Sequence, residues 1–225
     1  MKTIMSELKV DNVCYRYKNS SRAMLDGISC EFQAGQVTAV VGPSGSGKTT
    51  LLSILAGLDR PTGGRVLLDG QDLDGRDLDA YRRQDVSVIF QAFQLFPLLT
   101  VLENVCYPME LNGLAPKETK GRAKALLTQV GIQEEKFRRF PANLSGGEQQ
   151  RVAIARSLSA GGRILLADEP TGNLDGANSE NIVQILSGLA HDEGYCVIIV
   201  THDPAIADSS DVVYQMADGV LRRAP

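Results

Sequence analysis

Short apolar runs alternate along the chain with longer segments in which apolar residues recur every three or four positions. The clearest runs are Val37–Val41, Ile164–Ala167 and Val197–Val200. Their length and β-branched content are typical of buried parallel strands. Helical spacing follows the first run at Leu51, Ile54, Leu55 and Leu58, and the second run at Ile182, Ile185, Leu186 and Leu189. Strands and helices that alternate in this way predict an α/β fold around a central sheet.

Near both ends of the chain, apolar and polar residues alternate at every second position, as is typical of half-buried strands. Residues 7–33 are expected to be β structure, with apolar positions at Leu8, Val10, Val13, Ile28, Cys30 and Phe32. Residues 212–221 contain an Asp218–Gly219 turn between apolar segments, which predicts a hairpin. Shorter strands are expected at residues 66–68 and 85–90.

The middle of the chain, from residue 92 to about 160, changes to a helical pattern. Thr100 and Glu103 have the spacing of a capping box, so a helix is expected to begin there. Pro116 can begin the next helix, and Gly131 can end it. We therefore expect a helical segment inserted between two parts of the sheet.

Composition narrows the class of protein. The 225 residues suffice for one large domain or for one domain with an inserted lobe. The formal net charge of −4 argues against a general nucleic-acid binder. No apolar run approaches the ~20 residues that span a bilayer, and Met1–Glu7 lacks the apolar centre of a signal peptide. The four cysteines are scattered, so we expect a cytosolic protein without a zinc site or disulfide framework.

The first buried run leads into Gly42–Thr49, which matches the phosphate-loop pattern G-x-x-x-x-G-K-[ST]. Its glycines let backbone N–H groups approach a phosphate, and the following helix directs its positive dipole end at the same place. Lys48 would supply a point charge for the β- and γ-phosphates, and Thr49 a hydroxyl for Mg²⁺. The alternative is an ordinary glycine-rich turn before a core helix. A strand, loop and helix in register favour nucleotide binding.

A second helix start carries the octad Leu144–Arg151. Ser145 and Glu148 have the spacing of a capping box, which would be a purely structural explanation. Gly146 and Gly147, however, each destabilise a helix by about 1 kcal/mol relative to alanine. A sequence that keeps both glycines favours exposed backbone N–H groups for an anion at this helix start.

Polar residues follow the ends of three predicted strands. Asp168 and Glu169 follow one strand, as expected for Mg²⁺ support and for a base that activates water. Gln91 follows another strand and could reach a ligand, and His202 after a third could sense a γ-phosphate. Tyr17 precedes a polar stretch, where its ring could stack on adenine. Each residue also has a structural alternative, as a surface acid, a strand-end polar group, a cap or a packing residue.

Six motifs, taken together and in this order, resemble the ATP-binding subunit of an ABC transporter: Gly42–Thr49, Gln91, Leu144–Arg151, Ile164–Glu169, Asn173–Asp175 and His202. The resemblance covers essentially the whole chain. It implies an α/β phosphate-loop NTPase of ABC type, with a mixed central sheet, an N-terminal antiparallel β subdomain and an inserted α-helical subdomain. It also implies a single domain, in which residues 1–91 and 162–225 form the core with the β subdomain and residues 92–161 form the helical subdomain.

The resemblance implies ATP and Mg²⁺ as ligands and gives each site residue a role. ATP would be held by Tyr17, stacked on adenine, and at its phosphates by Gly42, Ser44, Gly45, Ser46, Gly47, Lys48, Thr49 and Thr50. Mg²⁺ would be ligated by Thr49 and Gln91 and supported through water by Asp168. Glu169, as general base, and His202, at the γ-phosphate, would act in catalysis together with Lys48 and Gln91.

A further group of residues would act on ATP held by a second copy of the chain: Ser145, Gly146 and Gly147, with Glu148 beside them. Asp175 would lie at the shared interface. The implied assembly is a head-to-tail dimer with two ATP molecules, which powers a separate membrane permease. We therefore expect a cytoplasmic protein that is peripheral on the inner face of the cell membrane, and no nucleic-acid partner.

The loop Glu169–Asp175 and the segments Phe90–Pro97 and Leu99–Val105 are similar to those of the macrolide-efflux, lipoprotein-release and bacitracin-resistance group. This likeness implies efflux or mechanical work at the envelope. Alternatives are an importer subunit, a cell-division-type switch that dimerises on ATP, and a soluble ABC ATPase acting on DNA or ribosomes. Candidates for the surface that receives a permease helix are Phe93, Leu95, Phe96 and Leu98, with core packing as the competing explanation for some of them.

Overall fold

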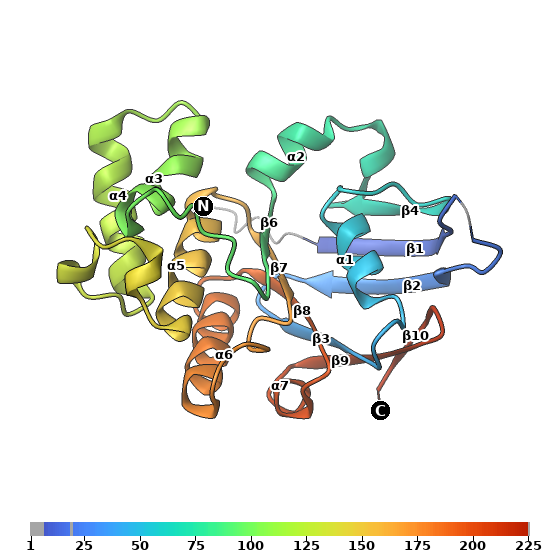
Figure 1. Cartoon of the computed structure of the whole chain (residues 1–225). Coiled ribbons are helices and arrows are strands. Elements are labelled where there is room, and N and C mark those ends of the chain that lie inside the picture. Colours follow the sequence, from blue (N-terminus) through green and yellow to red (C-terminus); the bar gives the residue numbers. More distant parts are fainter. Residues whose placement is uncertain (1–6, 19, 225) are drawn as a thin grey trace.

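The computed structural model describes residues 7–18 and 20–224. The expectation of a chain start without a signal peptide falls mainly on residues 1–6, which lie outside the described residues. Within the described residues, two sheets are flanked by helices (Figure 1).

The larger sheet has six strands in the order β10-β9-β3-β8-β7-β6. Its strands are β3 (Val37–Val41), β6 (Val86–Ile89), β7 (Ile164–Asp168), β8 (Cys196–Thr201), β9 (Val212–Ala217) and β10 (Val220–Arg223). Neighbours pair in parallel except β9 and β10, which form the predicted hairpin. The predicted mixed central sheet is therefore confirmed. The carboxyl ends of β3, β7 and β8 meet at one edge, because Val41 pairs with Thr201 and Asp168 pairs with Val200.

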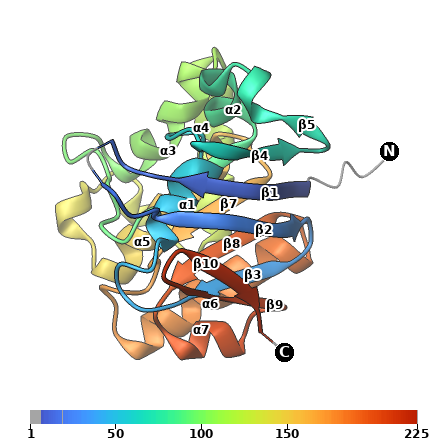
Figure 2. The ribbon, with the colours of Figure 1, turned by 90° about the vertical axis from the view of Figure 1, so that its right-hand side faces the viewer.

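The smaller sheet is antiparallel, with the order β2-β1-β4-β5. It comprises β1 (Glu7–Tyr15), β2 (Leu25–Gln33), β4 (Gly63–Leu68) and β5 (Gln71–Asp72). The predicted β structure is confirmed for residues 7–15 and 25–33, and the apolar positions of its alternating pattern are buried. Figure 2 views the molecule from the side that this sheet forms.

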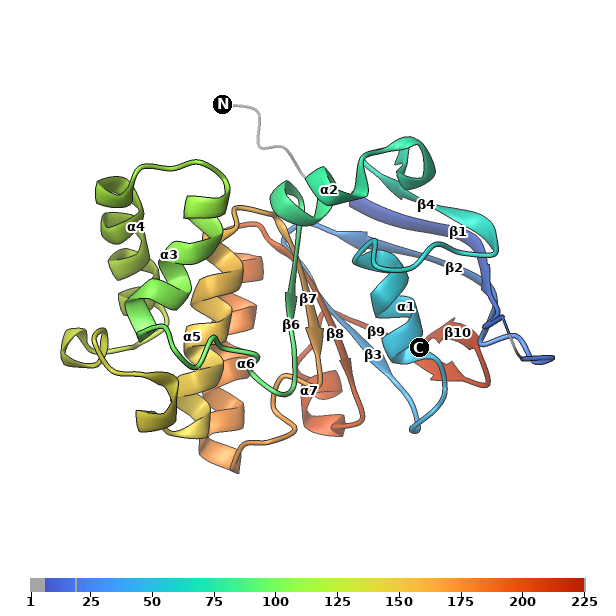
Figure 3. The same ribbon diagram turned by 45° about the horizontal axis from the view of Figure 1, so that its top comes forward.

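Helices cover both faces of the larger sheet. The α-helices are α1 (Lys48–Leu55), α2 (Leu78–Gln84), α3 (Val101–Leu111), α4 (Pro116–Gln129), α5 (Gly146–Ser159), α6 (Gly176–His191) and α7 (Pro204–Asp208). Short 3₁₀ helices are η1 (Leu73–Gly75), η2 (Glu134–Lys136) and η3 (Pro141–Asn143). Helices α3–α6 gather on one side of the larger sheet, whereas α1 lies on the other side, next to the smaller sheet (Figures 1 and 3).

Two hydrophobic clusters follow from this layering. In β7, Ile164 and Leu166 pack with α1 and the smaller sheet, whereas Leu165 and Ala167 pack with α3, α5 and α6. All four side chains are at most 1% exposed. Burial on both faces explains why this strand is apolar at every position before Asp168. The packed sheet thereby holds the strand ends in fixed places.

Two helices differ from the sequence-based expectation. Helix α1 ends at Leu55, and Leu58 is 55% exposed rather than part of the buried face. The chain turns after the helix at Gly57, where φ is +66°, as is common after a helix C-terminus. Helix α2 is not evident from the apolar pattern because only Tyr81 in it is buried, although Asp77 caps its start.

The segment of residues 92–100, expected to be helical, forms turns and bends instead. Helix α3 begins at Val101, and Thr100 and Glu103 make the predicted capping box. None of the helices within the described residues combines the length and apolarity that a bilayer span requires.

Candidate functional site

The phosphate-loop sequence connects β3 to α1, as predicted. Gly47 is the N-cap of α1 with φ +110°, a conformation that residues with a Cβ rarely adopt. A Cβ at Gly47 would also lie 2.8 Å from the carbonyl oxygen of Met24, so only glycine fits here. The first N–H groups of α1 therefore face the loop, where an anion would be stabilised.

Two polar side chains of the loop are buried. Lys48 is 8% exposed, and its ammonium donates to the carbonyl oxygens of Gly42 (2.8 Å) and Pro43 (3.1 Å). The hydroxyl of Ser46 is buried and has no hydrogen-bond partner among the described residues. A buried hydroxyl without a partner is unfavourable, so this loop fits a ligand rich in oxygen atoms, such as a phosphate chain.

The acidic end of β7 lies beside the loop. Burial and the neighbouring Glu169 raise the pKa of Asp168, while Lys48 and a hydrogen bond with Thr49 lower it, with a net upward shift. The charged form of Asp168 is therefore disfavoured here, and a bound cation would reverse that. A carboxylate beside a threonine hydroxyl supplies the oxygen ligands that Mg²⁺ prefers.

The two predicted catalytic side chains contact each other. The Glu169 carboxylate accepts a hydrogen bond from the Thr201 hydroxyl (3.0 Å), and its Oε1 lies 2.8 Å from Nδ1 of His202. Glu169 is largely buried whereas the His202 imidazole is 69% exposed. A hollow of about 770 Å³ between α6 and α7 includes both residues in its wall. One carboxylate oxygen of Glu169 is thus held by Thr201, whereas the other faces the exposed His202 and the hollow.

The backbone of Glu169 is strained. Its φ is +47°, in the left-handed region, and its N–H donates to the carbonyl oxygen of Val200 (2.9 Å). Non-glycine residues in this region are uncommon, and such strain clusters at functional sites. The neighbouring strand β8 therefore holds Glu169 in a conformation that its own preferences disfavour.

Gln91 lies just beyond β6 and contacts the loop that follows Glu169. Asn173 Nδ2 donates to the Gln91 carbonyl oxygen (2.9 Å). A Cβ at Gly172 would lie 2.7 Å from Gln91 Nε2, so this loop packs directly on the Gln91 side chain. The position of Gln91 is therefore tied to residues 172–173.

The octad forms the start of α5. The Ser145 hydroxyl accepts from the Glu148 N–H (3.3 Å), and the Glu148 carboxylate accepts from the Ser145 N–H (2.9 Å), which confirms the predicted capping box. Lys136 forms an ion pair with the same carboxylate and lowers the pKa of Glu148. The Glu148 carboxylate is therefore engaged within its own chain, where it orients Ser145.

The glycines of the octad lie against α6. A Cβ at Gly147 would lie 2.2 Å from Oδ1 of Asn178, so close packing alone requires glycine at this position. Asp175, the N-cap of α6, accepts hydrogen bonds from the N–H and the amide of Asn178. At Gly146 the nearest atoms are 3.5 Å or more from an added Cβ. Close packing therefore accounts for glycine at position 147 without an anion, whereas it does not account for glycine at position 146.

The structure brings the predicted site residues together in two separate groups. Near the phosphate loop lie Lys48, Thr49, Asp168, Glu169 and His202. Ser145, Gly146 and Gly147 lie beside Asp175 and the start of α6 instead. Helices α1 and α5 are on opposite sides of the larger sheet (Figure 3). The two helix starts therefore do not face one common ligand within a single chain.

The remaining predicted contacts lie at the mouth of the loop. Tyr17 is 47% exposed, and its hydroxyl lies 3.1 Å from the hydroxyl of Thr50. The Tyr15 ring packs edge-on against it, with 5.0 Å between ring centroids. Ser44 and Gly45 are exposed. One face of the Tyr17 ring is thus available beside the phosphate loop.

Sequence reasoning does not reveal three of the residues that position the site: Lys136, Asn178 and Thr201. Thr201 has a signal, since it is the polar last residue of an apolar strand and precedes His202. Lys136 has none, because its partner Glu148 lies in a different element, and the contact of Asn178 with Gly147 likewise joins two different helices. His191, at the end of α6, lies 2.9 Å from the Asp211 carboxylate and remains 46% exposed.

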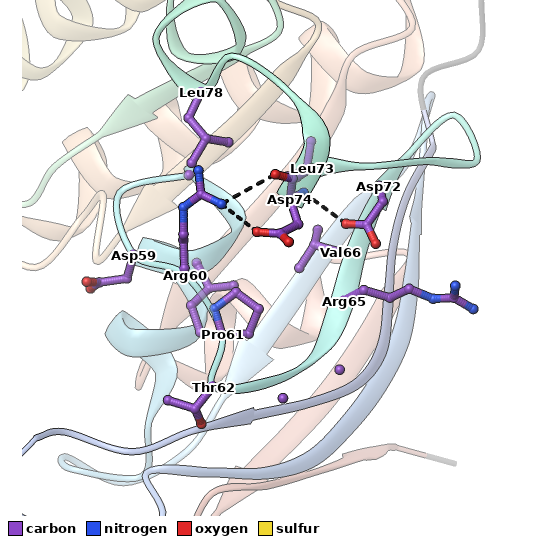
Figure 4. A pocket seen from close by; sticks show the side chains of 14 residues that line it. Asp59, Arg60, Pro61, Thr62, Arg65, Val66, Asp72, Leu73, Asp74 and Leu78 are labelled. Atoms are coloured by element: carbon purple, nitrogen blue, oxygen red, sulfur yellow. Dashed lines mark hydrogen bonds and ion pairs between the residues drawn. The ribbon is translucent and has the colours of Figure 1, made fainter.

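A separate pocket of about 220 Å³ lies between the end of α1, β4 and η1. Figure 4 shows Arg60 in its wall, with hydrogen bonds from the guanidinium to the carbonyl and carboxylate oxygens of Asp74. Both side chains are more than half exposed. The residues that line this pocket are all outside the predicted site, so it is not part of the nucleotide-binding arrangement.

Comparison with known proteins agrees with this geometry. A family model described as "ABC transporter" matches residues 25–172. The uncharacterized ABC transporter ATP-binding protein YclH of Bacillus subtilis is 44% identical over 215 residues, which cover 96% of this chain and 95% of that protein. The lipoprotein-releasing system ATP-binding protein LolD of Syntrophotalea carbinolica is 46% identical over 217 residues, with 94% and 95% covered.

A longer relative is the macrolide export ATP-binding/permease protein MacB of Chromobacterium violaceum. It is 45% identical over 221 residues, which are 96% of this chain but 34% of that protein. Among solved structures, the dimeric MJ0796 ABC transporter cassette is 37% identical, with a TM-score of 0.87 over 96% of this chain and 97% of that chain. A post-hydrolysis state of the same cassette, bound to ADP and Pi, has the same scores. The chain therefore belongs to the ABC transporter family and is an ATP-binding subunit with ATPase activity.

Proposed function

We propose that the chain hydrolyses MgATP in sites that two copies share in a head-to-tail dimer. The separation of its two phosphate-suited helix starts carries this proposal. One start, at Gly47–Lys48, and the other, at Ser145–Gly147, lie apart in one chain. A head-to-tail pair would place the second start of each copy over the ATP held by the other. The dimeric state of the MJ0796 cassettes supports this assembly.

In this proposal, ATP binds along the phosphate loop with its adenine on Tyr17. The Lys48 ammonium exchanges its two backbone acceptors for phosphate oxygens, and the buried Ser46 hydroxyl gains the partner that it lacks within the described residues. Thr49, Gln91 and Asp168 would hold Mg²⁺. That ion would supply positive charge to the β- and γ-phosphates.

Glu169 is the proposed general base, and His202 the proposed contact to the γ-phosphate. In the structure, these two side chains contact each other. A γ-phosphate offers His202 another hydrogen-bond acceptor, which frees Oε1 of Glu169 to accept a proton from a water molecule. The Thr201 hydroxyl keeps its bond to the other carboxylate oxygen and so preserves the orientation of Glu169.

A separate membrane permease is the proposed partner. Exposed apolar side chains next to α3 support this: Phe96, Leu98, Tyr107 and Leu111 are 38–87% exposed. The Phe96 and Tyr107 rings pack edge-on, with 4.9 Å between centroids. Exposed apolar side chains that contact one another, as this ring pair does, are typical of interaction surfaces. Leu95, also predicted as a docking residue, instead packs against the core. Core packing is therefore the explanation for this one residue of the predicted four.

The permease would place the chain on the inner face of the cell membrane. The names of LolD and MacB support efflux or envelope work rather than import. The close pair of Glu169 and His202 supports hydrolysis over a switch that only binds ATP. We further propose that residues 92–161 form a helical subdomain that carries both Ser145 and the permease surface. Residues 1–91 and 162–225 would form the core that binds ATP.

Replacing Glu169 by glutamine tests the ATPase mechanism. Glu169→Gln should bind MgATP and accumulate as a dimer, while phosphate release falls at least about 100-fold because the base is lost. Glu193→Gln changes an exposed glutamate at the other end of β8 and should keep the parental rate. Parental turnover in Glu169→Gln would remove Glu169 from its proposed role.

A further inference from the structure

Two consecutive residues of the irregular segment after β6 have left-handed backbones. Phe93 has φ +35° and Gln94 has φ +49°. Neither residue is a glycine, and side chains with a Cβ rarely adopt this conformation. Strained conformations of this kind persist only where surrounding groups hold them.

Arg156, in the third turn of α5, holds this pair of residues. Its Nη1 donates to the Gln94 carbonyl oxygen (2.6 Å) and its Nη2 donates to the Phe93 carbonyl oxygen (3.3 Å). Its Cζ lies 5.6 Å from the centre of the Phe96 ring. The planar guanidinium presents separate N–H groups to the two carbonyl oxygens and a flat face to the ring, a fixed geometry that an ammonium lacks. Burial lowers the pKa of Arg156, but a guanidinium stays charged in proteins.

Two other side chains hold the same segment on either side. Asn173 donates to the Gln91 carbonyl oxygen. Asn104, in α3, accepts from the Phe96 N–H (2.8 Å) and donates to the Phe96 carbonyl oxygen (3.1 Å). The segment therefore has little regular structure of its own and is fixed by α3, by α5 and by the loop after Glu169.

The segment also contacts the start of α5. The tip of the Phe93 ring lies 3.6 Å from the position of a Cβ at Gly146. Arg156 binds the carbonyl group of that same Phe93. One side chain of α5 thus fixes the loop that begins at Gln91 against the helix start that carries Ser145.

We propose that Arg156 is a positioning residue for ATP hydrolysis. It holds Phe93 and Gln94 in their left-handed conformation, and thereby fixes Gln91 and the Ser145 helix start relative to each other. Arg156 acts only through these residues. This inference rests on the proposed roles of Gln91 and Ser145 in the function described above.

Kinetics of Arg156→Met in the full chain test the proposal. Methionine keeps an unbranched apolar chain but removes both donors, so the loop relaxes and Gln91 shifts. We expect kcat to fall about 10- to 100-fold, as for other small misplacements of a reacting group, with KM for MgATP within about two-fold of the parent. Arg156→Lys keeps the charge and N–H donors but lacks the planar fork that reaches both carbonyl oxygens and the ring, so it should give an intermediate kcat.

A second substitution separates positioning from general folding. Glycine adopts a φ near +49° without strain, so Gln94→Gly in the Arg156→Met background should restore part of the lost kcat. Arg163→Met is the matched control. Arg163 also donates to a backbone carbonyl, that of Glu193 (3.2 Å), and stacks on an aromatic ring, that of Tyr195 (4.8 Å). It lies at the start of β7, and its loss should leave kcat unchanged.

Three results would overturn the inference. The first is a kcat for Arg156→Met that falls only in proportion to the folded fraction, measured by thermal unfolding. The second is a raised KM with unchanged kcat, and the third is no recovery with Gln94→Gly. Glu169→Gln in the same assay reports separately on the ATPase mechanism. If Glu169→Gln loses turnover while Arg156→Met keeps the parental kinetics, the positioning role of Arg156 is wrong but the proposed ATPase mechanism stands.

Discussion

Replacing Gly147 by alanine tests whether α5 begins in direct contact with α6. The new Cβ would lie 2.2 Å from Oδ1, 2.5 Å from Cγ and 3.0 Å from Cβ of Asn178. Such contacts are too short to persist, so Asn178 must move. Its amide donates to both carboxylate oxygens of Asp175, at 2.9 and 3.1 Å. The movement therefore also disturbs the N-cap of α6.

Three effects set the magnitude of the change. Overpacking costs about 1–3 kcal/mol. Weakened hydrogen bonds between Asn178 and Asp175, at a partly exposed position, add about 1 kcal/mol. Alanine in place of glycine stabilises a helix by about 1 kcal/mol. The net expectation for Gly147→Ala is a loss of about 2 kcal/mol, or roughly 4–8 °C in Tm for a chain of this size.

Thermal unfolding followed by circular dichroism measures this loss, with Gly146→Ala as the matched control. A Cβ at Gly146 meets only ordinary contacts of 3.5 Å or more. That variant should therefore keep the parental stability or gain up to about 1 kcal/mol. Asn178→Ala added to Gly147→Ala should recover part of the loss, because the amide group is removed. If Gly147→Ala is as stable as Gly146→Ala, the packing argument is wrong.

Two further predictions concern nucleotide affinity and pH. Tyr17→Ala should weaken ATP binding about 5- to 150-fold, the equivalent of about 1–3 kcal/mol of stacking on adenine. The control Tyr17→Phe loses only the hydroxyl contact with Thr50 and should bind ATP much more tightly than Tyr17→Ala. Equal ATP affinities of the two variants, measured by fluorescent-nucleotide titration, would contradict stacking. Lys136→Met should destabilise the chain by about 1 kcal/mol at pH 7. The Lys136 pair lowers the folded pKa of Glu148 from its ordinary 4.5, so its stabilisation is present above about pH 4.5 and is lost as pH falls through the lowered value. Denaturation curves of parent and variant should therefore converge in acid, and a difference that persists there would refute the assignment.

Local patterns in the sequence predict much of the fold. Continuous apolar runs identify β3, β7 and β8 because both faces of these strands are buried, and the motif Gly42–Thr49 correctly predicts a loop between one strand and one helix. The pattern is less informative where few side chains are buried, as in α2. The exposure of Leu58 shows the same limit, because helical spacing cannot say where the helix ends.

Contacts between distant segments are the part of the site that the sequence does not reveal. The Asp168–Glu169 pair is evident from its strand, but the bond between Glu169 and His202 depends on how β7 and β8 align. The sequence suggests a helix after residue 92. The structure instead has a strained loop, because Arg156, 62 residues beyond Gln94, stabilises it. Such long-range partners leave no periodic signal.

The most direct test of the shared ATP sites is the solution mass of two variants, Glu169→Gln and Glu169→Gln/Ser145→Asp. Each mass is measured with and without MgATP. Aspartate caps a helix about as well as serine, so α5 should still begin at the same place. The negative charge of the aspartate would repel the γ-phosphate of the ATP that the other copy holds. MgATP should double the mass of Glu169→Gln, whereas the double variant should bind MgATP and keep the mass of a single chain. If the double variant still dimerises with MgATP, Ser145 does not lie over the ATP of the other copy.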